Sequence, residues 1–358
     1  MPNLVEGPAA LGETDVRVIG QMLGAGLERD QERVTASGLA RSTFQEGKRR
    51  AYALGWLHDR YLPAPEAVGT PFVTFALLRP FVDRLNEVLG RLSDDPGTVL
   101  LWESESSVLA VLFHRGPSGP RTLRPSEGER SEGTREFFLT VDAREPSVPV
   151  YFDLEGAWCR WTGTPGPLRY PRPLPALPPR WRSGGSERVL RHPAISNLLS
   201  RPALATSGAR QPHLLGPRTL PRSQRKLLFS GLAEWRVFTD LARLPPYHGA
   251  RLSHVVLLHG TLREGARLIE VFQGVVQGAG ARPFLLASDR SKVLLGVLGS
   301  RPVGPSEGGA DPEGTAATEA LLQALGPSVS DIGIVRLPTS GLRSPVFHRY
   351  DRLLRGTE

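Results

Sequence analysis

The sequence has little cysteine, little lysine and no long apolar run, and each shortage excludes a class of protein. Cys159 is the only cysteine among 358 residues, so neither an internal disulfide nor a cysteine-based zinc site can form. No apolar segment approaches the roughly 20 residues that a membrane-spanning helix needs. The first 15 residues lack the basic and apolar segments of a signal peptide. We therefore expect a cytoplasmic protein with no membrane partner and no metal site.

The net charge is +8, and nearly all of the positive charge comes from arginine. The only lysines are Lys48, Lys226 and Lys292. A strongly basic chain favours an anionic partner, most often nucleic acid. A chain rich in Arg, Gly, Ala and Pro also fits a bias in genome base composition, which raises the charge without selection for function. Charge alone leaves both explanations open.

Sequence patterns typical of enzymes are also missing. The chain contains neither a phosphate-binding P-loop nor a G-x-G-x-x-G motif. Its eight histidines show no metal-ligand spacing. His254 and His259, five residues apart in an expected strand, should fall on opposite faces because side chains alternate along a strand. The sequence therefore predicts no catalytic residues, no cofactor and a protein that is not an enzyme.

What the chain does contain is the same unit twice, at an offset of roughly 180 residues. A basic helix opens at Arg41-Ser42 and again at Arg222-Ser223, and each continues to a Leu-Pro pair. In each copy an apolar strand, an amphipathic helix and two further apolar runs follow, at 72–78, 81–92, 99–102 and 108–113, and at 255–258, 266–276, 284–287 and 293–298. One chain would then carry the two halves of what is usually a symmetric dimer.

Local patterns predict the elements within each copy. Three helices are expected at 15–23, with Thr14 or Asp15 as its cap, at 31–37 and at 41–54, and a strand at 56–62 follows them. This order is that of a winged helix-turn-helix. The later segments of both copies predict a ferredoxin-like β-α-β-β-α-β sandwich. Its second half is clear only in copy two, as a helix at 315–325 capped by Thr315 and a strand at 329–337. In copy one, residues 136–142 and 148–161 are expected to form a strand pair.

These patterns divide the chain into six segments. The segment at 163–188 contains a proline-rich stretch with several arginines and is expected to be a semi-rigid linker. The predicted segments are a winged helix-turn-helix (1–65), an altered ferredoxin-like sandwich (70–162), the linker (163–188), a degenerate second winged helix-turn-helix (189–247), a second ferredoxin-like sandwich (251–340) and a tail (341–358).

The layout resembles the Lrp/AsnC family of prokaryotic transcriptional regulators. The resemblance rests on GLARSTFQEGKRRAYALGWLHDRYLP (Gly38–Pro63) and the PFVTFALLRPFVDRLNEVLGRL that follows. Residues 39–43 match the family's Leu-Ser-x-Ser/Thr-type start of the recognition helix, and residues 54–57 match its glycine-hydrophobic exit. The resemblance implies an α+β fold, with two winged helix-turn-helix domains each followed by a ferredoxin-like sandwich, pseudo-dimeric in one chain. It also implies a sequence-specific DNA-binding regulator that responds to an effector.

A recognition helix needs short polar side chains at its start and cations along its flank, because Arg, Lys and Gln bind base edges and phosphates. In copy one we expect groove contacts from Arg41, Ser42, Thr43, Gln45 and Arg49, and phosphate contacts from Lys48 and Arg50. In copy two the corresponding residues are Arg222, Ser223, Gln224, Arg225 and Lys226. The alternative is a solvated basic helix face whose arginine stems cover apolar surface.

Two other functions stay open at this point. The sirohaem decarboxylases resemble Lrp/AsnC proteins in fold and occur as paired or fused units, so a tetrapyrrole decarboxylase is the enzymatic alternative. The third alternative is an effector sensor or scaffold that does not bind DNA. The partners expected under the main hypothesis are double-stranded DNA, a small-molecule effector and the second half of the same chain, with a further homodimer left open.

Overall fold

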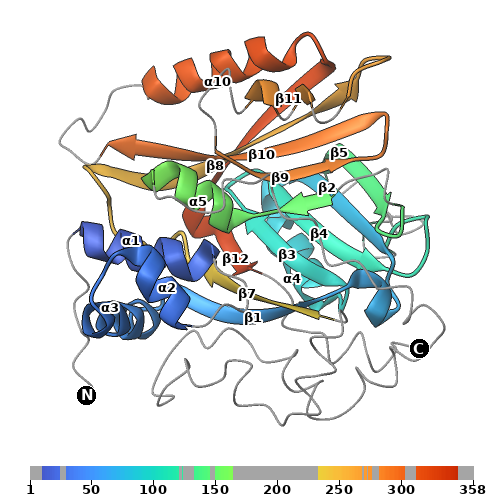
Figure 1. Cartoon of the computed structure of the whole chain (residues 1–358). Coiled ribbons are helices and arrows are strands. Elements are labelled where there is room, and N and C mark those ends of the chain that lie inside the picture. Colours follow the sequence, from blue (N-terminus) through green and yellow to red (C-terminus); the bar gives the residue numbers. More distant parts are fainter. Residues whose placement is uncertain are drawn as a thin grey trace.

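The fold of the chain comes from a computed structural model (Figure 1). The structure describes residues 10–24, 30–120, 123, 133–145, 150–163, 233–267, 270–271, 273–275, 282–302 and 312–345. The predicted linker, most of the predicted second helix-turn-helix and its contact residues Arg222–Lys226 lie outside the described residues.

Three short helices form the head of the molecule, at the lower left of Figure 1. They are α1 (Glu13–Gly24), α2 (Asp30–Ser37) and α3 (Arg41–Ala53), close to the bounds that the sequence predicts. Buried Val18 of α1 lies against Gly47 of α3, where an added Cβ would be 3.0 Å from the valine methyl. Because Gly47 has no side chain, the two helices approach closely. The predicted cap of α1 is wrong in position, since Thr14 and Asp15 lie inside the first turn.

A two-stranded ribbon connects this head to the second half of the chain. β1 (Leu57–Pro63) pairs antiparallel with β7 (Ala233–Thr239), with Leu57 opposite Thr239 and Pro63 opposite Ala233. The strand that the sequence predicts at the end of the first head therefore pairs with a strand from copy two. The two copies are joined here through main-chain hydrogen bonds.

Two five-stranded sheets carry the rest of the fold. In the first, with strand order β12-β3-β4-β2-β5, the strands from copy one are β2 (Phe72–Pro80), β3 (Thr98–Glu103), β4 (Val108–His114) and β5 (Gly133–Asp142). In the second, with order β11-β8-β10-β9-β6, the strands from copy two are β8 (Ala250–Leu262), β9 (Pro283–Ser288), β10 (Lys292–Pro302) and β11 (Val329–Pro338). In both sheets these four strands lie in the order fourth, first, third, second, which is that of a ferredoxin-like sandwich. The α+β class is confirmed.

Each sheet is completed by one strand from the other copy. β6 (Val150–Phe152) pairs with β9 of copy two, and β12 (Leu342–Pro345) pairs with β3 of copy one. The predicted strand pair at 136–142 and 148–161 is therefore wrong, because β5 pairs with β2 and β6 lies in the other sheet. Residues 154–162 form a helix, α5 (Leu154–Thr162), whose first turn is capped by Asp153 accepting the Gly156 N–H at 2.9 Å.

The two sheets pack face to face, and helices cover their outer sides. Side chains alternate between the two faces along each strand, as a pleated strand requires. The inner faces share one core with the head, in which Trp102 and Phe284 lie with ring centroids 5.8 Å apart. The outer faces form two smaller cores, under α4 (Leu85–Asp94) in sheet one and under α10 (Pro312–Leu325) in sheet two. Figure 1 shows α10 lying across the second sheet.

Several connecting elements complete the described fold. Helix α10 begins at Pro312, three residues before the predicted cap Thr315, and proline suits the first turn because its missing N–H is not needed there. In the helix predicted at 266–276, residues 270–271 and 273–275 are helical. Single turns of 3₁₀ helix lie at Pro65–Val68 (η1), Val82–Arg84 (η2) and Thr339–Gly341 (η8).

The contact between the halves can be tested at Trp102, which is fully buried and donates its indole N–H to the Pro338 carbonyl at 2.7 Å. Trp102→Phe removes this donor and part of the ring that packs on Phe284. Because a part-buried carbonyl then loses its partner, we expect a loss of about 1–3 kcal/mol of unfolding free energy, measured by urea denaturation. Trp161→Phe is the control, since the Trp161 indole makes no hydrogen bond within the described residues. Equal losses for both variants would contradict this prediction.

Candidate functional site

The first turn of α3 presents the polar residues that the sequence predicts for DNA contact. Arg41, Ser42 and Thr43 are exposed there, and Gln45 is half-buried one residue beyond the buried Phe44. This exposure is compatible with contact to a partner. The contact itself stays a prediction.

The basic flank of α3 is partly engaged within the head. Arg50 forms an ion pair with Asp15 of α1, whose side chain is only 8% exposed, and so holds α3 against α1. Arg49 lies 3.4 Å from Glu46 on its own helix. Lys48 is half-buried. A phosphate that bound Arg50 would have to compete with a buried carboxylate.

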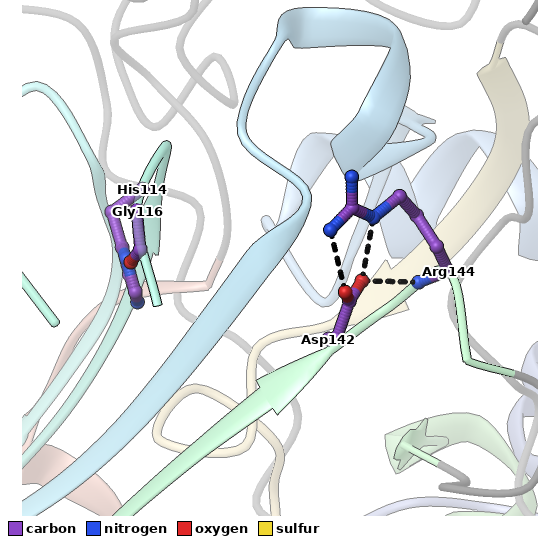
Figure 2. Close-up of polar contacts among 4 residues, drawn as sticks. All are labelled: His114, Gly116, Asp142 and Arg144. Atoms are coloured by element: carbon purple, nitrogen blue, oxygen red, sulfur yellow. Dashed lines mark hydrogen bonds and ion pairs between the residues drawn. The ribbon is translucent and has the colours of Figure 1, made fainter. Parts of the chain in front are cut away.

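A buried histidine, His114, links three neighbouring strands of sheet one through Thr74 and Thr140; Figure 2 shows His114 with Gly116. The His114 Nδ1 lies 2.6 Å from the Gly116 carbonyl oxygen, which can only accept, so Nδ1 carries the proton. In the neutral ring Nε2 is then an acceptor for the Thr74 hydroxyl at 2.6 Å, and Thr74 is 2.8 Å from the Thr140 hydroxyl. Burial lowers the pKa of His114, against the opposing effects of the Gly116 hydrogen bond and the Asp95 charge. The imidazole is therefore held neutral in a fixed tautomer.

An arginine–carboxylate pair is connected to this histidine through the Phe72 ring. Arg144 donates from Nε and Nη2 to the two Asp142 carboxylate oxygens at 2.8 and 2.6 Å, as Figure 2 shows. The Arg144 hydrogen bond lowers the pKa of the Asp142 carboxyl. Phe72 stacks on His114 at 5.8 Å, and the Arg144 guanidinium lies 5.2 Å from the Phe72 ring centroid. Asp142 balances the arginine charge, so this cluster offers no net positive charge to an anion.

His254 and His259 each occupy space above a glycine of the neighbouring strand. An added Cβ on Gly299 would lie 2.2 Å from the His254 ring, and one on Gly333 would lie 2.2 Å from the His259 ring. The His259 ring also packs on Phe137 of β5 at 5.0 Å, across the contact between the two sheets. Burial lowers the pKa of His259. Within the described residues, no group of three His, Cys, Asp or Glu side chains could hold a metal ion.

Two half-buried arginines lie where α5 of copy one meets β9 of copy two. Arg160 of α5 donates from Nη2 to the Pro283 carbonyl oxygen, at the start of β9. Arg282, the residue before Pro283, lies 3.4 Å from the Ser300 hydroxyl through Nη1. We call Arg160 and Arg282, with Ser300, the junction site. Each copy supplies one of its two cations.

Neither guanidinium group of the junction site has an ion-pair partner within the described residues. Burial lowers the pKa of both Arg160 and Arg282, and only Asp153 acts on Arg160 as an opposing carboxylate charge. A guanidinium stays protonated in proteins, so both groups keep their charge. The Arg160 Nε is buried and has no hydrogen-bond acceptor among the described residues. Half-buried cations without an ion pair favour an anionic ligand, which would supply a countercharge.

Sequence reasoning does not find the junction site. Arg160 falls in a segment predicted as strand, and Arg282 lies before an apolar run with nothing in its local sequence to distinguish it from other arginines. The Arg160 side chain reaches Pro283, the residue next to Arg282, because the pairing of β6 with β9 places α5 at the start of β9.

Comparison with known proteins gives matches among solved structures alone. No protein-family model matches the sequence, and no curated protein matches it. Two matching structures are of the siroheme decarboxylase NirDL, one of them in co-complex with an iron-uroporphyrin III analogue. The structure of the complex is 12% identical in sequence to this chain, with a TM-score of 0.43. The alignment covers 96% of this chain and 100% of the NirDL chain. The other is 13% identical with a TM-score of 0.43, and covers 96% and 97%.

One expectation from the sequence is corrected by these matches. The absence of catalytic motifs predicts a protein that is not an enzyme, whereas both matching structures are of an enzyme. Neither match assigns a role to a residue of this chain. A second finding concerns membranes: no helix within the described residues has the length and apolar character to span a bilayer.

The neutral state of His114 predicts a pH dependence of stability. The folded pKa lies below the ordinary value of about 6.5, so the unfolded chain binds more protons as pH falls through 6.5. The contribution of neutral His114 is present above that pH and is lost as pH falls toward the folded pKa. The unfolding free energy of the parent protein should therefore fall between about pH 7 and 5, and in His114→Asn the part of this fall that comes from His114 should disappear. His248→Asn, at an exposed histidine, is the control that should keep the full slope.

Proposed function

We propose that this chain is an enzyme that acts on a carboxylate-bearing tetrapyrrole, and that the junction site binds carboxylates of this substrate. The observation that carries the proposal is the pair of half-buried guanidinium groups, Arg160 and Arg282, without ion-pair partners among the described residues. This is the enzymatic alternative that the sequence leaves open, as a protein of the sirohaem decarboxylase kind.

The chemistry of the site fits a substrate that carries several carboxylates. Carboxylates are ionised at neutral pH, and the planar guanidinium fork can donate two parallel hydrogen bonds to one carboxylate. Arg160 already uses Nη2 on Pro283, and Arg282 contacts Ser300 through Nη1, so both heads are oriented by the protein. A ligand therefore meets cations whose positions are largely fixed before binding.

A decarboxylase site must allow the carbon–carboxylate bond to break and must hold the rest of the substrate in place. The bond between a side-chain carbon and its carboxylate breaks, CO₂ leaves, and the electron pair on carbon takes up a proton. The remaining carboxylates must meanwhile be held so that the reacting one is correctly placed. We assign this holding role to Arg160 and Arg282. Because each comes from a different copy, the site needs both halves of the chain.

The proposal predicts that a tetrapyrrole carrying carboxylates binds the full-length protein and shifts the Soret absorbance band. Arg282→Leu should weaken this binding about 10- to 100-fold, because one charge-assisted hydrogen bond contributes about 1.5–3 kcal/mol. The same variant should unfold no more readily than the parent protein, since it removes a half-buried cation that has no ion pair with any described residue. Binding is measured by absorbance titration, and stability by thermal unfolding.

Arg301→Leu is the matched control, because Arg301 is the next residue along β10 from Ser300 and is exposed. It should leave the absorbance titration unchanged. Turnover is read as loss of CO₂ from the tetrapyrrole by mass spectrometry. If neither a Soret shift nor a mass change appears, the proposed function is wrong.

Double-stranded DNA is the second candidate partner, and the exposure of Arg41, Ser42 and Thr43 at the start of α3 favours it. In this case the chain would be a sequence-specific regulator, with Gln45, Arg49 and Lys48 adding contacts along the helix. Arg50 is a poor choice for a test, since its loss would also leave Asp15 without its partner.

Under the DNA hypothesis, Arg41→Ala should weaken binding to genomic DNA fragments about tenfold, because one base or phosphate contact contributes about 1–3 kcal/mol. The measurement is a gel shift at low salt, where phosphate contacts are strongest. Arg17→Ala is the control, since Arg17 is an exposed arginine on α1, about half accessible and paired with Glu13. No shift of any fragment by the parent protein would exclude DNA as the partner.

A further inference from the structure

Helix α5 is attached to β9 at two successive carbonyl groups. At the start of the helix the Asp153 N–H donates to the Phe284 carbonyl at 2.7 Å. In its last turn Arg160 donates from Nη2 to the Pro283 carbonyl. Phe284 is the extra residue of a bulge in β9, where the register against β10 shifts. Both ends of the helix are therefore fixed against copy two, beside the residue that follows Arg282.

The Asp153 carboxylate has a fixed place over the first turn of α5. Its Oδ1 accepts the Gly156 N–H at 2.9 Å, and the residue is buried. A Cβ added to Gly156 would lie 2.2 Å from Oδ2, a distance that real Cβ atoms do not show. Glycine at position 156 therefore leaves the space that the carboxylate occupies.

The same space borders the Arg160 guanidinium. The Cβ added to Gly156 would lie 3.4 Å from Arg160 Nη1, so Nη1 and the Asp153 Oδ2 are both close to one point. Burial lowers the pKa of Arg160, and the Asp153 charge opposes this effect. Arg160 thus has a carboxylate beside it before any ligand binds.

A ligand carboxylate that binds Arg160 would also approach Asp153. Like charges repel each other, and solvent and salt screen this repulsion less where the groups are partly buried. From this geometry we infer that Asp153 sets the affinity of the junction site, because its carboxylate competes with ligand carboxylates for Arg160 and so weakens their binding. The inference rests on the proposed function, since it concerns the ligand carboxylate at Arg160.

The test is isothermal titration of the full-length protein with uroporphyrin III and with citrate, at constant ionic strength. Asp153→Asn removes the charge and keeps an oxygen that can accept the Gly156 N–H, and Asn caps helices about as well as Asp does. We expect this variant to bind both probes at least about threefold more tightly than the parent protein. Asp153→Ser, a second neutral capping variant, should change both affinities in the same direction.

Two further variants show where the effect arises. Asp83→Asn is the matched control, because it removes one negative charge from an exposed residue of η2, and it should leave both titrations unchanged. In an Arg160→Leu background, Asp153→Asn should raise the affinity by less than about twofold, because the competition requires the guanidinium. Thermal unfolding of each variant checks that the helix cap is kept.

The outcomes separate this inference from the proposed function. If the affinity is unchanged or lower in both neutral variants, or if the gain persists in Arg160→Leu, the inference is overturned, and tetrapyrrole binding by the parent protein would still support the proposed function. A gain for citrate that is lost in Arg160→Leu, with no binding of uroporphyrin III, would keep the role of Asp153 and overturn the tetrapyrrole. Binding of neither probe would overturn both.

Discussion

The apolar contact between the inner faces of the two sheets is the interaction on which the rest of the structure depends. Ferredoxin-like sheets have two apolar faces, and one helix layer covers only the outer one, under α4 and α10. The inner faces must find another apolar surface, and in this chain each covers the other. The exchange of β6 and β12 then adds main-chain hydrogen bonds across the same contact. Neither copy could keep its inner face buried alone.

The strand exchange also determines where function can arise. Because β6 pairs with β9, the helix that follows β6 is carried to the start of β9 in the other copy. Arg160 thereby reaches the Pro283 carbonyl next to Arg282. A site at this junction is a consequence of pairing between copies, and it would not exist in a single sandwich. The head also packs against both copies, because its strand β1 pairs with β7 and its helices contribute to the core between the sheets.

Sequence patterns predict the elements of this fold better than its contacts. The head helices and most strands have periodic apolar residues, so their positions follow from local pattern alone. The strand prediction is wrong at residues 154–161 because the signal there is a helix cap at Asp153, followed by apolar residues that pack on α1 as well as on strands of the other copy. The exposed residues at the start of α3 are predictable from a local motif. The junction site is not, because Arg160 and Arg282 are separated by more than a hundred residues and only strand exchange carries Arg160 to the residue next to Arg282.

Fusion explains why the two copies need not keep the same site. In a symmetric dimer of identical chains, a residue that builds a site at one end builds it at the other as well. In one chain, position 282 can be arginine while position 97 is glycine, although the two carbonyls accept matching strand hydrogen bonds, from Leu298 and Phe113 respectively. The sheets stay alike because both must bury an inner face, a requirement that acts equally on each copy. Residues at the sheet ends are free of that requirement, so charge could diverge there without loss of the common core.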